Sequence, residues 1–101
     1  MRLTAHEKQV ITAAVHHVDP DAEIWLFGSR ADDRRRGGDI DLALLSGRIG
    51  RKEIHAIRHE ICDHIGEQKI DLVVAPTRDH PMLALAIEHG VPLVEKRDPI
   101  R

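Results

Sequence analysis

The order of apolar segments along the chain is the feature that most constrains its fold. Short runs suited to strands, most of them rich in Ile, Leu and Val, occur at residues 24–27, 39–45, 69–75 and 91–96. Longer stretches in which apolar residues recur at helical spacing occur at residues 3–18, 51–66 and 80–90. Because these two kinds of segment interleave, the sequence predicts an α/β fold with one sheet flanked by helices.

The predicted helices carry recognisable end signals. Thr4 and Glu7 have the spacing of a capping box at the start of the first helix. Pro81 stands near the first position of the third helix, and Gly66 and Gly90 follow the second and third helices, where helices often end. These signals predict boundaries as well as the presence of the helices.

Length and composition favour one domain. The chain has 101 residues, of which 42% are apolar, which is enough for one hydrophobic core. Trp25 and Phe27 are its two aromatic residues, so the core must be built mainly from Ile, Leu, Val and Ala. We therefore expect residues 1–101 to form a single domain.

Charge, cysteine content and hydropathy narrow the class of protein further. A net charge of −2 argues against direct nucleic-acid binding driven by overall charge. The single cysteine, Cys62, cannot form an intramolecular disulfide. No apolar run approaches the ~20 residues that span a bilayer, and the first ten residues lack a signal-peptide core. We expect a cytoplasmic protein without membrane contact.

Three aspartates stand in segments that should be strands, where aspartate is depleted. Asp39 and Asp41 occur in "DIDLALL", and Asp71 occurs in "KIDLVVA". Because strand side chains alternate between faces, Asp39 and Asp41 should share one face, with Cα atoms about 7 Å apart. Clustered carboxylates repel one another unless a cation lies between them. Oxygen ligands without His or Cys select hard cations such as Mg²⁺, which usually also binds substrate phosphates.

A Gly-Ser pair directly after the first strand complements this group of aspartates. Gly28 allows the backbone to approach a ligand closely, and Ser29 can offer its hydroxyl and backbone N–H to an anion. Arg30, and less directly the arginines at 34–36, could balance phosphate charge, although a solvated loop explains 34–36 better. Ser29 is locally explained equally well as a helix N-cap. The Walker P-loop pattern is absent.

Together, "GSRADDRRRGGDIDL" and "KIDLVV" resemble the nucleotidyltransferase superfamily of the DNA polymerase β type, and more narrowly its minimal nucleotidyltransferases. The resemblance covers residues from about 24 to 75 and implies a single catalytic palm with a small mixed sheet. Nine residues separate Ser29 from Asp39, where ten is common in these small proteins. Joint presence of Gly-Ser, Asp-x-Asp and a later strand Asp is what makes the resemblance specific.

The resemblance also implies roles for individual residues. Gly28 and Ser29, with Arg30 beside them, would hold the nucleotide phosphates. Asp39, Asp41 and Asp71 would bind metal and act in catalysis, and Asp71 would either bind metal or help deprotonate the attacking hydroxyl. The implied cofactors are two Mg²⁺ ions, with ATP as the substrate from which AMP is transferred.

Minimal nucleotidyltransferases are often encoded beside a small helical HEPN protein, and such pairs act as toxin–antitoxin modules. The resemblance therefore implies an antitoxin that transfers AMP to a hydroxyl of a HEPN-family RNase toxin, in a hetero-oligomer with that toxin. Three alternatives stay open. The first is a non-catalytic antitoxin that neutralises by binding, and the second is a transferase acting on a small molecule such as an aminoglycoside. The third is a carboxylate-lined metal site with no nucleotide role. An Asp39→Asn variant should still neutralise the toxin only in the binding case.

Eight histidines also raise the question of a zinc site. His55 and His59 have the i, i+4 spacing of a zinc pair, but the HExxH pattern is absent. Both lie off the apolar stripe of their predicted helix, which favours a solvated or partner-facing surface. The three aspartates could also be strand-end residues that face solvent and have no role in binding. That interpretation does not account for the nearby Gly-Ser pair.

Overall fold

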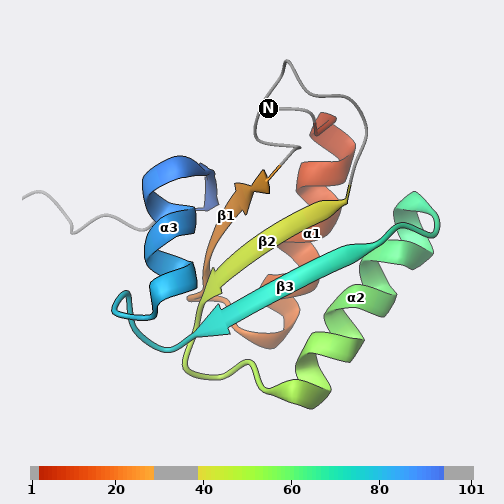
Figure 1. Cartoon of the computed structure of the whole chain (residues 1–101). Coiled ribbons are helices and arrows are strands. Elements are labelled where there is room, and N and C mark those ends of the chain that lie inside the picture. Colours follow the sequence, from red (N-terminus) through yellow and green to blue (C-terminus); the bar gives the residue numbers. More distant parts are fainter. Residues whose placement is uncertain (1–2, 29–38, 95–101) are drawn as a thin grey trace, which may run out of the picture.

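A computed structural model describes residues 3–28 and 39–94 of the chain. Helices and strands interleave in this part of the chain, as predicted (Figure 1). The elements are, in chain order, α1 (Ala5–Val18), β1 (Glu23–Phe27), β2 (Ile40–Leu45), α2 (Arg51–Ile65), β3 (Ile70–Ala75), α3 (Pro81–His89) and β4 (Val91–Val94).

The strands form one mixed sheet in the order β3-β2-β1-β4. β2 and β3 run parallel and are joined through α2, whereas β1 runs antiparallel to both of its neighbours, β2 and β4. The predicted α/β class with a small mixed sheet is therefore confirmed. Strands β3 and β4 are the two edges of the sheet.

Most predicted boundaries agree with the structure to within two residues. The capping box at α1 is present, because the Glu7 N–H donates to Thr4 Oγ1 (3.0 Å) and the Thr4 N–H donates to Glu7 Oε1 (2.9 Å). Gly66 and Gly90 follow the ends of α2 and α3. Asp39, predicted as the first residue of its strand, precedes β2, which begins at Ile40. Residues 95 and 96 of the last predicted strand lie outside the described residues.

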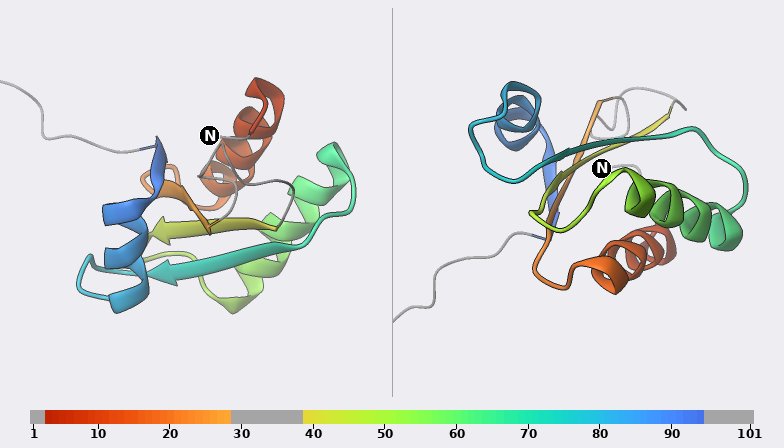
Figure 2. Two further views of the ribbon diagram at one scale, coloured as in Figure 1. Left: turned by 45° about the horizontal axis from the view of Figure 1, so that its top comes forward. Right: turned by 90° about the horizontal axis from the view of Figure 1, so that it is seen from below.

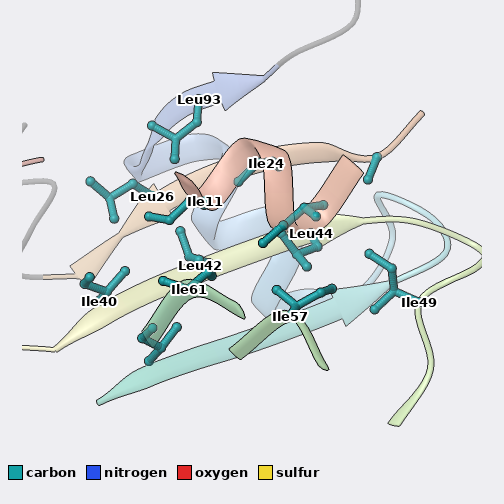
Figure 3. Packing of buried hydrophobic residues seen from close by; sticks show 14 residues of the cluster. Ile11, Ile24, Leu26, Ile40, Leu42, Leu44, Ile49, Ile57, Ile61 and Leu93 are labelled. Atoms are coloured by element: carbon teal, nitrogen blue, oxygen red, sulfur yellow. The ribbon is translucent and has the colours of Figure 1, made fainter. Parts of the chain in front are cut away.

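One face of the sheet is covered by α1 and α2, and this side holds the main hydrophobic core (Figures 2 and 3). Alternate residues of β2 point into it, and they meet apolar residues of both helices. The fully buried side chains shown there include Ile11, Ile24, Leu26, Ile40, Leu42, Leu44, Ile57 and Ile61. As composition predicts, this cluster contains no aromatic residue.

The other face is packed against α3, which lies on the side opposite α1 and α2 (Figure 2). Leu83 and Ala86 of α3 pack over Trp25, Ala43 and Ala75 in a second, smaller cluster. Trp25 is fully buried, whereas Phe27 at the end of β1 is half-buried. Helix α3 therefore does not cover one end of the sheet. At that end β1 ends, and β2 and β3 begin.

No helix among residues 3–28 and 39–94 has both the length and the apolar character to cross a membrane.

Candidate active site

Two of the predicted site residues face each other across neighbouring strands. In the parallel pairing of β2 with β3, Asp41 is the partner of Asp71, and adjacent strands lie about 4.8 Å apart. Ile40 and Leu42 point into the main core, so alternation places Asp41 on the opposite face of the sheet. Asp71 lies on the same face by the same pairing. Both carboxylates thus lie at the open end of the face that α3 partly covers.

Gly28 brings the backbone of the first turn against the Asp41 carboxylate. The preceding residue, Phe27, is the antiparallel partner of Asp41. A Cβ atom placed on Gly28 would lie 2.3 Å from Asp41 Oδ2, which no side chain could occupy without displacing the aspartate. Gly28 also has φ of +74°, a left-handed conformation that glycine adopts at least cost. The backbone conformation therefore favours glycine here, and another residue would also have to displace the Asp41 side chain, which can rotate.

The electrostatics of the site are dominated by Asp41. Burial raises the pKa of its carboxyl above the ordinary value, and the neighbouring charges of Asp71 and Asp39 raise this pKa further. A hydrogen bond between the side chains of Asp41 and Asp71 acts in the same direction, whereas Lys69 lowers the pKa of Asp41. The group is therefore a set of mutually repelling carboxylates with Lys69 nearby, and a bound divalent ion would relieve this repulsion.

Asp39 lies just before β2 and forms an ion pair with Lys69, and its charge also acts on Asp41. Its Oδ2 is 3.6 Å from Lys69 Nζ, and its side chain is 45% exposed. Asp41 is half-buried and Asp71 is exposed. Asp41 and Asp71 thus lie within strands, as predicted, near the end of the sheet where the cover of α3 stops.

The donor set fits a hard cation, but only two of its members already converge. Asp41 and Asp71 are direct partners on neighbouring strands, so one cation could bind both carboxylates. Across residues 3–28 and 39–94, no three His, Cys, Asp or Glu side chains are grouped so that they could hold a metal ion. Asp39 would have to leave Lys69 to become the third ligand.

Of the remaining predicted residues, some lie outside the part of the chain that the structure describes and others lie within it. Ser29 and Arg30, together with the arginines at 34–36, lie outside the described residues, so their phosphate-binding roles stay predictions. His55 and His59 are exposed on α2, in agreement with a surface position. Cys62 is half-buried, and its Sγ donates to the Gln68 carbonyl at 3.7 Å.

Lys69 is the one site residue that the sequence argument did not single out. It lies two residues before Asp71, and in an extended segment this spacing places two side chains on the same face. That spacing is the signal that could have identified it. Lys69 contributes a positive charge beside three carboxylates and so stabilises the group.

Comparison with known proteins identifies the family to which this geometry belongs. A search of curated proteins found no match. A family model described as "Polymerase beta, Nucleotidyltransferase" matches residues 8–99, which include every strand and helix except the first three residues of α1. The aspartate pair at the end of a mixed sheet, with a glycine held against it, is therefore found in a chain that belongs to the polymerase β nucleotidyltransferase family.

Proposed function

We propose that this nucleotidyltransferase transfers AMP from ATP to a hydroxyl group of a partner protein, with Mg²⁺ as cofactor. The observation that carries the proposal is the contact between the Gly28 backbone and Asp41, next to Asp71. It places a glycine turn suited to phosphate beside carboxylates suited to a divalent ion. These are the two components that nucleotidyl transfer needs.

The chemistry follows from the residues of this end of the sheet. The acceptor hydroxyl oxygen attacks the α-phosphate, a new O–P bond forms, and the bond to the departing pyrophosphate breaks. Bound Mg²⁺ would lower the pKa of the acceptor hydroxyl and stabilise the charge on the pyrophosphate. Asp41 and Asp71 would hold that cation, and the exposed Asp71 is placed to accept the hydroxyl proton. Next to Gly28, Ser29 and Arg30 would bind the phosphate chain.

The open position of the site supports a protein acceptor. Asp71 is exposed and lies on an edge strand, so a bulky folded partner can bring a hydroxyl to it without entering a closed cavity. In line with the resemblance, we propose that the partner is a helical HEPN-family toxin and that the cytoplasm is the compartment. The protein would then be an antitoxin that neutralises its partner by AMP transfer.

Incubation with ATP labelled at the α-phosphate, Mg²⁺ and the protein encoded by the neighbouring reading frame tests the proposal. We expect label and an added mass of AMP on the partner. Asp41→Asn and Asp71→Asn should each reduce labelling by about 100-fold or more, because each removes a charged ligand at the reacting centre. The matched control is Asp79→Asn, an exposed aspartate in the turn before α3, which should keep wild-type labelling.

Two other outcomes would replace the proposal. If the partner is neutralised without label, and Asp41→Asn neutralises it equally well, the protein is a binding inhibitor. If an aminoglycoside is labelled and no protein is, the acceptor is a small molecule.

A further inference from the structure

The strand that carries Asp71 forms one edge of the sheet, because β3 pairs only with β2. The Ile40 N–H of β2 donates to the Lys69 carbonyl, so alternate residues from position 69 onward direct their backbone groups toward β2. The residues between them direct their backbone groups away from the sheet. Leu72 and Val74 are the two such residues in the middle and second half of β3.

Part of this edge is capped by α2. Arg58 donates from its Nε to the outward carbonyl of Ile70 at 3.0 Å. Within residues 3–28 and 39–94, no hydrogen bond uses the outward N–H or C=O of Leu72 or Val74. Each of these two residues therefore leaves one donor and one acceptor available to another strand. We call these groups the free edge of β3.

The two edges of the sheet differ in how they are protected against pairing. β4 contains Pro92, which has no N–H, and its pairing with β1 is irregular. Proline and an irregular register both hinder the addition of a further strand. β3 has the sequence IDLVVA without proline, and its register on β2 is unbroken. Of the two edges in the described structure, the one beside the proposed active site is therefore better suited to pairing.

A strand added to this edge would present different residues to the two faces of the sheet. Leu72 and Val74 pack against the main core but are only half-buried, and Ile54 of α2 is half-buried against the same core. Apolar side chains of an added strand would extend the core on this face. On the opposite face, the residue paired with Asp71 in an antiparallel strand would have its Cβ about 5 Å from that of Asp71. The occupant that fits is an extended segment with apolar residues on one face and a hydroxyl residue on the other.

The size of the edge favours a transient occupant over a second copy of this chain paired through β3. The strand has six residues, which corresponds to an edge about 20 Å long. A stable interface buries roughly 800 Å² of each partner, which one added strand of this length does not reach. An acceptor segment has to leave after transfer, so a small contact made through the backbone is appropriate to it.

We infer that the acceptor protein binds by adding an antiparallel segment to the free edge of β3, so that its hydroxyl residue lies opposite Asp71. The backbone groups of Leu72 and Val74 would pair with the segment. Across this end of the sheet the order is Gly28, Asp41, Asp71 and then the added strand. With the phosphates at Gly28, the hydroxyl would approach from the far side, as in-line displacement requires. The inference rests on the proposed function for the identity of the acceptor, whereas strand addition is a property of the edge.

Amide hydrogen exchange of the full chain tests strand addition directly. The probe is the capped heptapeptide Lys-Val-Ser-Val-Ser-Val-Lys, whose valines would lie on the core face and serines on the site face. When about 90% of the protein is bound, exchange of the Leu72 and Val74 amides should slow about tenfold, because only the free fraction exchanges. The amides of Asp71 and Val73 already face β2, so their exchange should change little.

Two N-methylated forms of the peptide are the matched controls. In antiparallel pairing, the valine amides face β3 and the serine amides face away from it. N-methylation of the valines should therefore abolish the protection of Leu72 and Val74, whereas N-methylation of the serines should preserve it. Both forms keep the side chains and charges of the probe, so they separate backbone pairing from side-chain attraction.

A variant of the protein supplies a second test. Val74→Pro removes an outward donor at a position where an edge strand can hold proline, and it should weaken peptide binding about tenfold, the loss of roughly one hydrogen bond. Arg51→Pro is the control, because it places a proline at the first position of α2, where proline is tolerated, and it should keep the wild-type affinity.

Wild-type exchange keeps the test decisive if Val74→Pro does not fold. Unchanged exchange of Leu72 and Val74 at the highest soluble peptide concentration, or equal protection by the valine-methylated peptide, would overturn the inference. Protection of these amides without nucleotidyl transfer to any peptide or partner protein would instead refute the proposed function and leave strand addition in place.

Discussion

At the scale of single residues, the clustered carboxylates of the site lower the stability of the metal-free protein. Asp41 carries a raised pKa because burial and two neighbouring aspartates disfavour its charged form. An acid whose pKa is raised on folding stabilises the native state at low pH, below its ordinary value of 3.8. That contribution is lost as the pH rises through the folded pKa. At neutral pH the ionised Asp41 therefore destabilises the metal-free protein.

We therefore expect Asp41→Asn to raise the melting temperature of the metal-free protein at pH 7. Since Asp41 is partly exposed and screened, the gain should be about 0.5 kcal/mol, or roughly 2–4 °C for a chain of this size. The gain should shrink below pH 4, where the carboxyl is protonated in both states. Thermal scans in a chelating agent measure it.

The same scans with Mg²⁺ supply a second readout. Magnesium should raise the melting temperature of the wild-type protein, because it binds the native state, and should have little effect on Asp41→Asn. An Asp41→Asn variant that is less stable than wild type at every pH would show that the carboxylate is structural rather than strained.

At the scale of secondary-structure elements, the end of α3 lies close against the backbone of β1 at Gly90. A Cβ atom on Gly90 would lie 2.4 Å from the Ala86 carbonyl oxygen and 2.6 Å from the Leu26 carbonyl oxygen. Both are backbone atoms, which cannot rotate away. Gly90 thus sets how closely α3 packs on the sheet, and with it how much of the site face stays open.

Gly90→Ala should destabilise the protein by about 2 kcal/mol, because either the end of α3 or β1 must shift. Gly47→Ala is the matched control, since no atom lies within 4 Å of its Cβ position and its φ does not favour glycine. Urea unfolding curves compare the two. Equal stability of both variants would mean that α3 adjusts freely on the sheet.

At the scale of the whole molecule, a buried polar contact joins two turns far apart in the sequence. The Ser46 hydroxyl donates to Asp19 Oδ2 at 2.5 Å and accepts from the backbone N–H groups of Arg48 (3.0 Å) and Ile49 (3.2 Å). Asp19 follows α1, and Ser46 follows β2. The contact therefore fixes the end of the sheet opposite the site, and so the strand positions on which the Asp41–Asp71 pairing depends.

Ser46→Ala should cost about 2–3 kcal/mol, because it removes the hydrogen bond to Asp19 Oδ2 and leaves the Arg48 and Ile49 N–H groups without the Ser46 acceptor. Thr77→Ala, at an exposed position in the turn after β3, should be nearly neutral. Equilibrium unfolding of the two variants decides the point. A neutral Ser46→Ala would indicate that water replaces the hydroxyl.

The parts of this fold that could be predicted are those marked by local signals in the sequence. The Thr4–Glu7 capping box and the glycines after α2 and α3 gave helix ends that the structure confirms. The start of α2 is less marked, since Gly50 has no side chain and only Glu53 Oε1 accepts from its N–H (2.8 Å). Alternation in β2 likewise separated Leu42 in the core from Asp41 on the site face.

The candidate site was predicted only in part, because its geometry depends on pairing between strands. Sequence spacing placed Asp39 and Asp41 together and marked Asp71 as their companion. The structure adds the direct pairing of Asp41 with Asp71 and the ion pair of Asp39 with Lys69. No local pattern contains the register of β2 on β3, which is selected by burial of both strands against α2.

The sequence by itself determined the class of fold, the helix ends and the residue types available for nucleotidyl transfer, because these depend on periodicity and on chemistry within a few neighbouring positions. Tertiary structure alone decided two other properties: which carboxylates converge and how far α3 covers the site face. These depend on strand order, register and the approach of helices to the sheet, which are set by contacts between segments distant in the chain.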